Sequence, residues 1–237
     1  MDLGLEGRVA VVAAASRGLG KASAEALAAE GARVVICARG ADALERTAQG
    51  IAASGAEVLA LVCDVTAPDA PGRLVDAAIG RFGRIDVVVA NSGGPPSGRA
   101  LDVDDASVVA AVEANLLASV RLTRAALPHL RAARWGRICC IASASVLRPI
   151  PELALSNIAR TGLWAWARTA AADLRGTGVT LNLACPGTHA TDRMRELGRA
   201  GEGAGDPADF GRVVAFLCSE PAGYLNGAAV AVDGGAL

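Results

Sequence analysis

Apolar residues along this chain alternate between short uninterrupted runs and longer stretches with helical spacing. The short runs are apolar at successive positions, which is typical of strands that are covered on both faces. We expect such strands at residues 9–13, 33–37, 57–62, 85–90, 137–141, 179–184 and 229–232. The longer stretches repeat apolar residues every three or four positions and predict helices at residues 20–30, 41–54, 69–82, 104–114, 116–133, 152–174 and 208–219.

The alternation of strands and helices predicts an α/β fold, a doubly wound parallel β-sheet of the Rossmann type in three α/β/α layers. The spacing continues from end to end without a linker, so residues 1–237 are expected to form a single domain. With 52% hydrophobic and 20% charged residues, the chain can bury a large core and is not a disordered protein.

Charge and cysteine usage narrow the range of partners. The net charge of −1 argues against binding to a nucleic-acid backbone. We expect no membrane-spanning helix, because no apolar run reaches about 18 residues, and no signal peptide, because the acidic N-terminus lacks a basic start. Six cysteines without a Cys-x-x-Cys pair and two histidines give no metal-ligand spacing, so we expect buried free thiols, no metal and a cytoplasmic location.

A glycine-containing turn joins the first expected strand to the first expected helix. Residues 13–20 read Ala-Ala-Ala-Ser-Arg-Gly-Leu-Gly. A strand, a glycine turn and a helix N-terminus present backbone N–H groups to a phosphate. The turn therefore predicts a dinucleotide site, and a tight turn without a ligand is the alternative.

From this turn onward the sequence resembles the short-chain dehydrogenase/reductase family, and most closely its β-ketoacyl-carrier-protein-reductase-like branch. Residues 13–20 resemble the family's Thr-Gly-x-x-x-Gly-x-Gly turn, and residues 91–94, Asn-Ser-Gly-Gly, resemble its Asn-Asn-Ala-Gly motif. Further matches are Asp64-Val65 for the adenine-contacting Asp, Asn115 for the structural and catalytic Asn, Ser143 for the catalytic Ser, Pro186-Gly187, and the closing Val232-Asp233-Gly234-Gly235. The resemblance covers essentially the whole chain.

The resemblance implies a nicotinamide cofactor and names the residues that would contact it. They are Ala14, Ser16, Arg17, Gly18, Leu19, Gly20, Arg39, Asp64, Val65, Asn91, Gly93, Arg160, Pro186, Gly187 and Thr188. An NAD site usually places an acid about 20 residues after the glycines, whereas the second expected strand ends in Ala38-Arg39-Gly40. Arg39 and Arg17 could clamp a 2′-phosphate, so we expect NADP(H) in preference to NAD(H). Two solvated surface arginines are the alternative.

One position departs from the family's phosphate turn. The first glycine of the motif is Ala14 in this chain. If the position needs a positive φ, alanine costs about 1 kcal/mol or more, and cofactor affinity is reduced.

The catalytic pattern departs further. In the family, a Tyr thirteen positions after the catalytic Ser exchanges a proton with the substrate oxygen, and a Lys four residues later lowers the pKa of that Tyr. Here these positions are Ser156 and Arg160, and the only Tyr and Lys are Tyr224 and Lys21. The candidate catalytic residues are therefore Asn115, Ser143, Ser156 and Arg160.

An aliphatic hydroxyl is far less acidic than a phenol, and an arginine stays charged, so the usual proton donor is missing or replaced. Ser156 acting through a water, or His189 in the loop after Gly187, could replace it. A solvent-exposed His189 without a role is the plainer expectation. We expect Tyr224 to pack at a domain edge and His129 to lie on a helix surface.

Two functions remain open at this point. The first is an NADP(H)-dependent oxidoreductase that reduces a ketone or 3-oxoacyl group, or oxidises a secondary alcohol, with altered proton chemistry. The second is a catalytically silent NADP(H)-binding protein, either a sensor or a partner of an active relative. A different Rossmann-like enzyme, such as a methyltransferase, is disfavoured only through the resemblance.

The resemblance also bears on the substrate lid and on assembly. Residues 191–206 are few and glycine-rich, which implies a shortened substrate lid and, around 198–205, a mobile loop. The helices at 116–133 and 152–174 correspond to those of the family's dimer bundle, where Leu163, Ala167, Ala170 and Leu174 would form an apolar face. We expect a homodimer or homotetramer that acts on a small-molecule carbonyl or alcohol, with no nucleic-acid or membrane partner.

Overall fold

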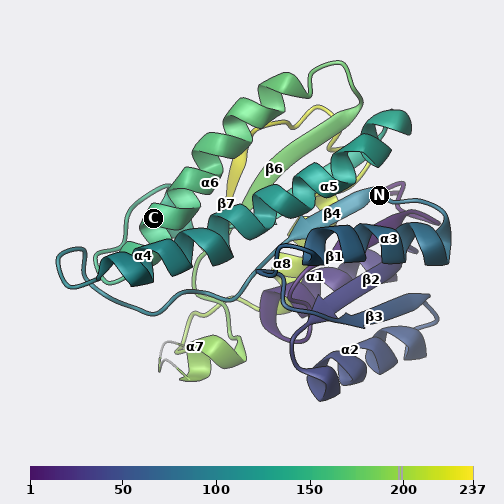
Figure 1. Cartoon of the computed structure of the whole chain (residues 1–237). Coiled ribbons are helices and arrows are strands. Elements are labelled where there is room, and N and C mark those ends of the chain that lie inside the picture. The colour runs from purple at the N-terminus through teal and green to yellow at the C-terminus, as the bar shows by residue number, and fades with distance from the viewer. Residues whose placement is uncertain (197, 199, 237) are drawn as a thin grey trace.

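The computed structural model describes every residue except Leu197, Arg199 and Leu237. It has one seven-stranded parallel sheet in the order β3-β2-β1-β4-β5-β6-β7 (Figure 1). The strands are β1 (Val9–Val12), β2 (Arg33–Ala38), β3 (Val58–Val62), β4 (Val87–Ala90), β5 (Gly136–Ile141), β6 (Val179–Pro186) and β7 (Ala229–Val232). All seven expected strands are present, and the doubly wound Rossmann-type fold is confirmed.

Helices cover both faces of the sheet. The helices are α1 (Gly18–Ala29), α2 (Ala41–Ala53), α3 (Ala70–Phe82), α4 (Asp105–Val112), α5 (Ala118–Ala132), α6 (Ala154–Asp173), α7 (Asp192–Glu196) and α8 (Pro207–Leu217). One layer holds α1, α2 and α8, and the other holds α3, α5 and α6. The short helix α7 had no counterpart among the predicted elements.

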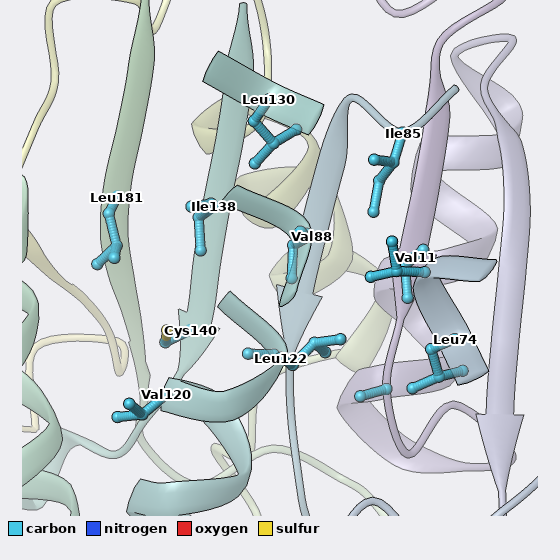
Figure 2. Close-up of a cluster of buried hydrophobic side chains, with 14 of the residues drawn as sticks. Val11, Leu74, Ile85, Val88, Val120, Leu122, Leu130, Ile138, Cys140 and Leu181 are labelled. Atoms are coloured by element: carbon cyan, nitrogen blue, oxygen red, sulfur yellow. The ribbon is translucent and has the colours of Figure 1, made fainter. Parts of the chain in front are cut away.

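The strands read as uninterrupted apolar runs because both faces are buried. In β1, Val9 and Val11 pack into the core beneath α3, α5 and α6, whereas Ala10 and Val12 pack into the core beneath α1 and α8. Figure 2 shows the first of these cores, where strand side chains meet residues of α3 and α5. The residues that make this contact are Val11, Val88, Ile138, Leu181, Leu74, Leu122 and Leu130.

The two helices expected at 104–114 and 116–133 form one continuous helix. A π-helical turn, Glu113–Leu117, joins α4 to α5 and carries Asn115. By length and composition alone, the helix Asp105–Ala132 could cross a bilayer, and 39% of its most apolar 18-residue stretch is buried. In this fold it packs against α3, α6 and β4, as a core helix does.

The face of α6 that we expected to form an oligomer contact is buried within the chain. Leu163, Ala167 and Leu174 are at most 3% exposed, and Ala170 packs against the same core. The prediction for these residues is wrong because the sheet of the same chain covers this stripe. All six cysteines are buried and free, as expected.

The strand order places a ligand site at one edge of the sheet. The chain runs outward from β1 to β3 and then returns to β4 on the other side of β1. In an open parallel sheet, ligands bind outside the carboxyl ends of the strands at this switch point. The loops that leave β1, β4, β5 and β6 meet there, and they carry most of the site residues expected from the sequence.

Candidate functional site

The β1–α1 turn is packed too tightly for a side chain at its last glycine. A Cβ on Gly20 would overlap the carbonyl oxygen of Ala14 and would lie 2.6 Å from Nδ2 of Asn91. That Nδ2 donates a hydrogen bond to the same carbonyl at 3.2 Å, which ties the turn to the end of β4. No side chain caps the N-terminus of α1, so its first N–H groups are available to a phosphate.

Ala14 adopts the backbone conformation that the family's glycine would favour. Its φ is 49°, in the left-handed region, whereas the following Ala15 has an ordinary backbone. We therefore expect Ala14→Gly to relieve strain and to raise the free energy of unfolding by up to about 1 kcal/mol. Urea denaturation, with and without NADPH, would measure both the gain and any tighter cofactor binding.

The neighbouring alanine provides the control for this change. Ala15 is fully buried, and its N–H donates to the carbonyl of Cys37 at 2.9 Å. Ala15→Gly should lower stability, because it adds chain entropy to the unfolded state and relieves no strain. Equal effects at the two positions would show that the positive φ of Ala14 carries no cost.

Two arginines and an aspartate lie near the ends of β1, β2 and β3. The contact between Ala15 and Cys37 brings the turn that carries Arg17 beside the end of β2, where Arg39 is exposed. Oδ1 of Asp64 accepts hydrogen bonds from N of Thr66 at 2.9 Å and from its Oγ1 at 2.8 Å. These bonds, with a smaller effect of Arg39, lower the pKa of Asp64. The carboxylate is thus held charged and fixed in place.

The four candidate catalytic residues lie on three segments that pack together. Asn115 is buried in the π-helical turn, where Nδ2 donates to the carbonyl of Ala111 and Oδ1 accepts from Oγ of Ser92, both at 3.3 Å. Oγ of Ser143 accepts from N of Ser145 at 3.1 Å, in the turn that follows β5. Helix α6 packs against both turns and supplies the remaining two residues.

Ser156 and Arg160 form a pair on α6. Nη1 of Arg160 donates to Oγ of Ser156 at 2.9 Å, one helical turn apart. Burial lowers the pKa of the Arg160 guanidinium to about 10, so it still carries its charge at neutral pH. Burial also raises the pKa of the neighbouring Cys185 thiol to about 12, although a backbone hydrogen bond from Ser143 and the charge of Arg160 oppose this. The pair therefore presents a fixed cation beside a neutral thiol.

His189 is not the exposed loop residue that we expected. Its side chain is buried, and its ring meets Phe210 edge-on at 5.3 Å between centroids. Its Nδ1 lies 3.3 Å from the carbonyl oxygen of Gly187, and its ring packs against the backbone of Gly205. His189 therefore holds the base of its own loop.

The only Tyr and Lys lie on other segments than the four candidate catalytic residues. Tyr224 is fully exposed, so the expectation that it packs at a domain edge is wrong. Lys21 lies on α1 and pairs with Glu25 at 3.6 Å. His129 is exposed on α5, as predicted.

Two backbone hydrogen bonds join the start and the end of the segment that was expected to form a substrate lid. N of Ala190 donates to the carbonyl of Gly205 at 2.9 Å, and N of Gly205 donates to that of Thr188 at 3.0 Å. The intervening chain carries α7, where Oγ1 of Thr191 accepts from N of Met194 at 3.3 Å. This Thr cap was the sequence signal for α7. Arg199 of the mobile loop expected at 198–205, and Leu197 just before it, lie outside the described residues.

Contacts also link this segment to the phosphate turn. Nη1 of Arg17 lies 3.3 Å from Oε1 of Glu196, and both side chains are exposed. A Cβ on Gly18 would lie 3.5 Å from the methyl group of Thr191. A separate hollow of about 580 Å³ lies between the loop after β4 and the start of α6, and neither Ser143 nor Arg160 lines it.

These features define an α/β protein with a doubly wound, Rossmann-type sheet, and comparisons with known proteins identify its family. A family model described as enoyl-(acyl carrier protein) reductase matches residues 13–236. Dehydrogenase/reductase SDR family member 4 of Sus scrofa is 30% identical over 245 residues, which cover 98% of this chain and 88% of that protein. The chain belongs to the short-chain dehydrogenase/reductase family.

Two further similarities connect the chain to reductases. The 3-oxoacyl-[acyl-carrier-protein] reductase MabA of Mycobacterium tuberculosis is 32% identical over 238 residues, covering 96% of this chain and 92% of that protein. The structure of L-sorbose reductase from Gluconobacter frateurii, complexed with NADPH and L-sorbose, superposes with a TM-score of 0.93 at 30% identity. That match covers 100% of this chain and 99% of the other.

Proposed function

We propose that this protein is an NADP(H)-dependent carbonyl reductase in which Ser156 and Arg160 replace the family's Tyr and Lys. The observation that carries the proposal is the 2.9 Å hydrogen bond between these side chains, on a helix packed against the turns of Asn115 and Ser143. Reductase relatives support a carbonyl substrate, and NADPH in similar structures supports the cofactor.

The residues present fit a dinucleotide. The absence of a side chain at Gly20 leaves the turn closely packed, and α1 begins without a side-chain cap. Backbone N–H groups of this kind bind a pyrophosphate. Asn91 would hold the turn, Asp64 would contact the adenine, and Arg160 would reach the nicotinamide ribose.

The side chains then divide the reduction between charge stabilisation and proton delivery. When bound, the reduced nicotinamide supplies a hydride to the carbonyl carbon. The hydroxyl of Ser143 would donate a hydrogen bond to the carbonyl oxygen as it becomes negative, and the positive charge of Arg160 would stabilise that oxygen. Oγ of Ser156 accepts from Arg160, so its own hydrogen can be donated to a bound water. That water would give a proton to the oxyanion, and the hydroxide that remains would take a proton from solvent. Asn115 keeps the π-helical turn in place.

The proposal is tested by NADPH consumption with a panel of small ketones and 3-oxoacyl thioesters. We expect slow turnover that is lost in Arg160→Ala. The alternative is a silent NADP(H)-binding protein, which is favoured because Tyr224 is fully exposed and Lys21 pairs with Glu25 on α1. Tight NADPH binding with no oxidation of the cofactor by any substrate would establish that alternative.

Cofactor choice should depend on Arg39 and Arg17. Both are exposed at the adenine end, and guanidinium groups suit a 2′-phosphate. We expect Arg39→Ala to weaken NADPH binding by about tenfold or more, with little change for NADH, because charge-assisted hydrogen bonds are lost. Calorimetric titration of both cofactors measures this.

Glu196 offers a change in the opposite direction. It competes for Arg17 across an exposed ion pair. Glu196→Gln should therefore strengthen NADPH binding slightly, by up to about fivefold, since such pairs contribute at most about 1 kcal/mol.

Equal loss of NADPH and NADH binding in Arg39→Ala would refute the 2′-phosphate role.

We also propose that the protein is a homodimer or homotetramer, through a different surface from the one first expected. Val109 on α4 and Ile158 on α6 are 63% and 45% exposed, and the two helices pack against each other. Val109→Glu with Ile158→Glu should yield monomers in multi-angle light scattering. Val62→Glu, at the equally exposed edge strand β3, is the control and should leave the mass unchanged. A monomeric wild-type protein at micromolar concentration contradicts the proposal.

A further inference from the structure

Arg160 is a half-buried arginine without an acidic partner among the described residues. In the described part of the chain, no acidic side chain lies within 4.0 Å of its guanidinium, and Oγ of Ser156 is its one hydrogen-bond partner. Arg137 provides the contrast. That side chain is 4% exposed, but it donates to the carbonyl oxygens of Ser219, Gly136 and Gly178 and lies 4.0 Å from Glu220.

The thiol beside Arg160 does not supply the missing negative charge. Cys185 keeps its proton at neutral pH, because burial raises the pKa of the thiol to about 12. A guanidinium has five N–H donors, and among the described residues one of those of Arg160 has a protein acceptor. Arg160 is half-buried, so its free N–H groups remain open to a ligand, and a guanidinium in this state can pair with an anion through them.

The two serines of the candidate site also have hydrogens to donate. Oγ of Ser143 accepts from N of Ser145, and Oγ of Ser156 accepts from Arg160, so the hydroxyl hydrogens of both serines remain to be donated. A cluster of two hydroxyl donors and a forked cation matches a group that only accepts hydrogen bonds. A carboxylate is such a group, and it pairs with a guanidinium through two parallel bonds.

We infer that the Ser156–Arg160 pair is a carboxylate-binding site, and that the carbonyl substrate of this protein is a short oxo acid. The assignment of a carbonyl group to the substrate rests on the proposed reductase function, whereas the assignment of a carboxylate does not. The free edge of the Arg160 guanidinium would bind the carboxylate. The hydroxyl of Ser143 would then face the neighbouring carbonyl oxygen. A neutral ketone would offer Arg160 no negatively charged partner.

Binding in the absence of turnover tests the inference. Acetoacetate and acetoacetamide have nearly the same shape and differ in charge. Each is titrated by calorimetry into the protein saturated with NADP⁺, which cannot reduce either compound. We expect acetoacetate to bind at least about tenfold more tightly than the amide, as charge-assisted hydrogen bonds require. Equal affinities, or no binding of acetoacetate, overturn the inference.

Three variants separate the carboxylate role from others. Arg160→Met should remove the preference for the acid, and Arg160→Lys should retain part of it, because the charge remains without the fork. Arg168→Met changes an exposed arginine on the same helix and should leave both affinities unchanged. Equal weakening of acid and amide in Arg160→Met, with weaker NADP⁺ binding, would show that Arg160 holds only the cofactor and would overturn the inference.

The outcome is independent of whether the protein is a reductase. A protein that binds acetoacetate in preference to the amide, yet oxidises no NADPH with either, keeps the carboxylate site and loses the proposed function. A protein that reduces both compounds with equal kcat/KM keeps the function and loses the site.

Discussion

Replacing Ser156 by tyrosine and Arg160 by lysine together should raise kcat for carbonyl reduction by about 10²- to 10⁴-fold. This range is the usual contribution of a positioned general acid. The wild-type pair offers an aliphatic hydroxyl and a permanently charged guanidinium, 2.9 Å apart, and neither releases a proton readily at neutral pH. A phenol one turn from an ammonium group would restore an acidic donor on the same face of α6. Single-turnover oxidation of NADPH with a fixed ketone measures the change.

Two matched variants isolate the hydroxyl. Ser156→Phe with Arg160→Lys adds the same ring without its proton and should show no gain. Ser156→Tyr alone keeps Arg160. The guanidinium of Arg160 donates to Oγ of Ser156 in the wild type, so it would compete with the new ring for space. The rate of carbonyl reduction by the variant with both Ser156→Tyr and Arg160→Lys should fall at alkaline pH, because the phenol loses its proton. The wild-type rate should not fall. No gain, with folding and NADPH binding intact, would mean that proton donation does not limit this site.

The fold could be predicted because its pattern is redundant. Each strand is buried on both faces, so apolar runs such as Val9–Val12 mark it without any long-range information. The π-helical turn at Glu113–Leu117 could not be found in this way, because its residues continue the helical pattern on either side. The stripe Leu163, Ala167 and Leu174 was misassigned for a related reason: helical spacing identifies an apolar face but does not say whether the same chain covers it.

The site could be predicted only as far as chain order determines it. Loops at the carboxyl ends of parallel strands meet at one edge, so the positions of Asn91, Ser143 and Gly187 followed from the strand assignment. The burial of His189 did not follow, because it depends on Phe210 in a later helix. The hydrogen bond between Ser156 and Arg160 was likewise absent from any motif, since it arises from a pair that the family does not share.

Asp86→Ala should cost about 3 kcal/mol of unfolding free energy, the largest effect on stability that we expect from a single side chain. The carboxylate is fully buried at the opposite edge of the sheet from the candidate site. Its Oδ2 accepts from N of Val9 at 2.9 Å and from Nε of Arg84 at 2.7 Å, and its Oδ1 accepts from Arg8 at 3.2 Å. Its removal leaves the Val9 N–H and two cations without their acceptor at the start of the sheet.

Graded variants show which of these contacts carries the cost. Asp86→Asn keeps one acceptor oxygen for Val9 but loses both ion pairs, and because Arg8 and Arg84 are partly solvated, it should lose about half as much stability as alanine. Asp173→Ala, on the exposed end of α6, should stay within about 0.5 kcal/mol of wild type. Urea denaturation gives all three values. A loss below about 1 kcal/mol in Asp86→Ala would contradict the structure, because it requires the Val9 N–H and the two arginines to lose their shared acceptor at almost no cost.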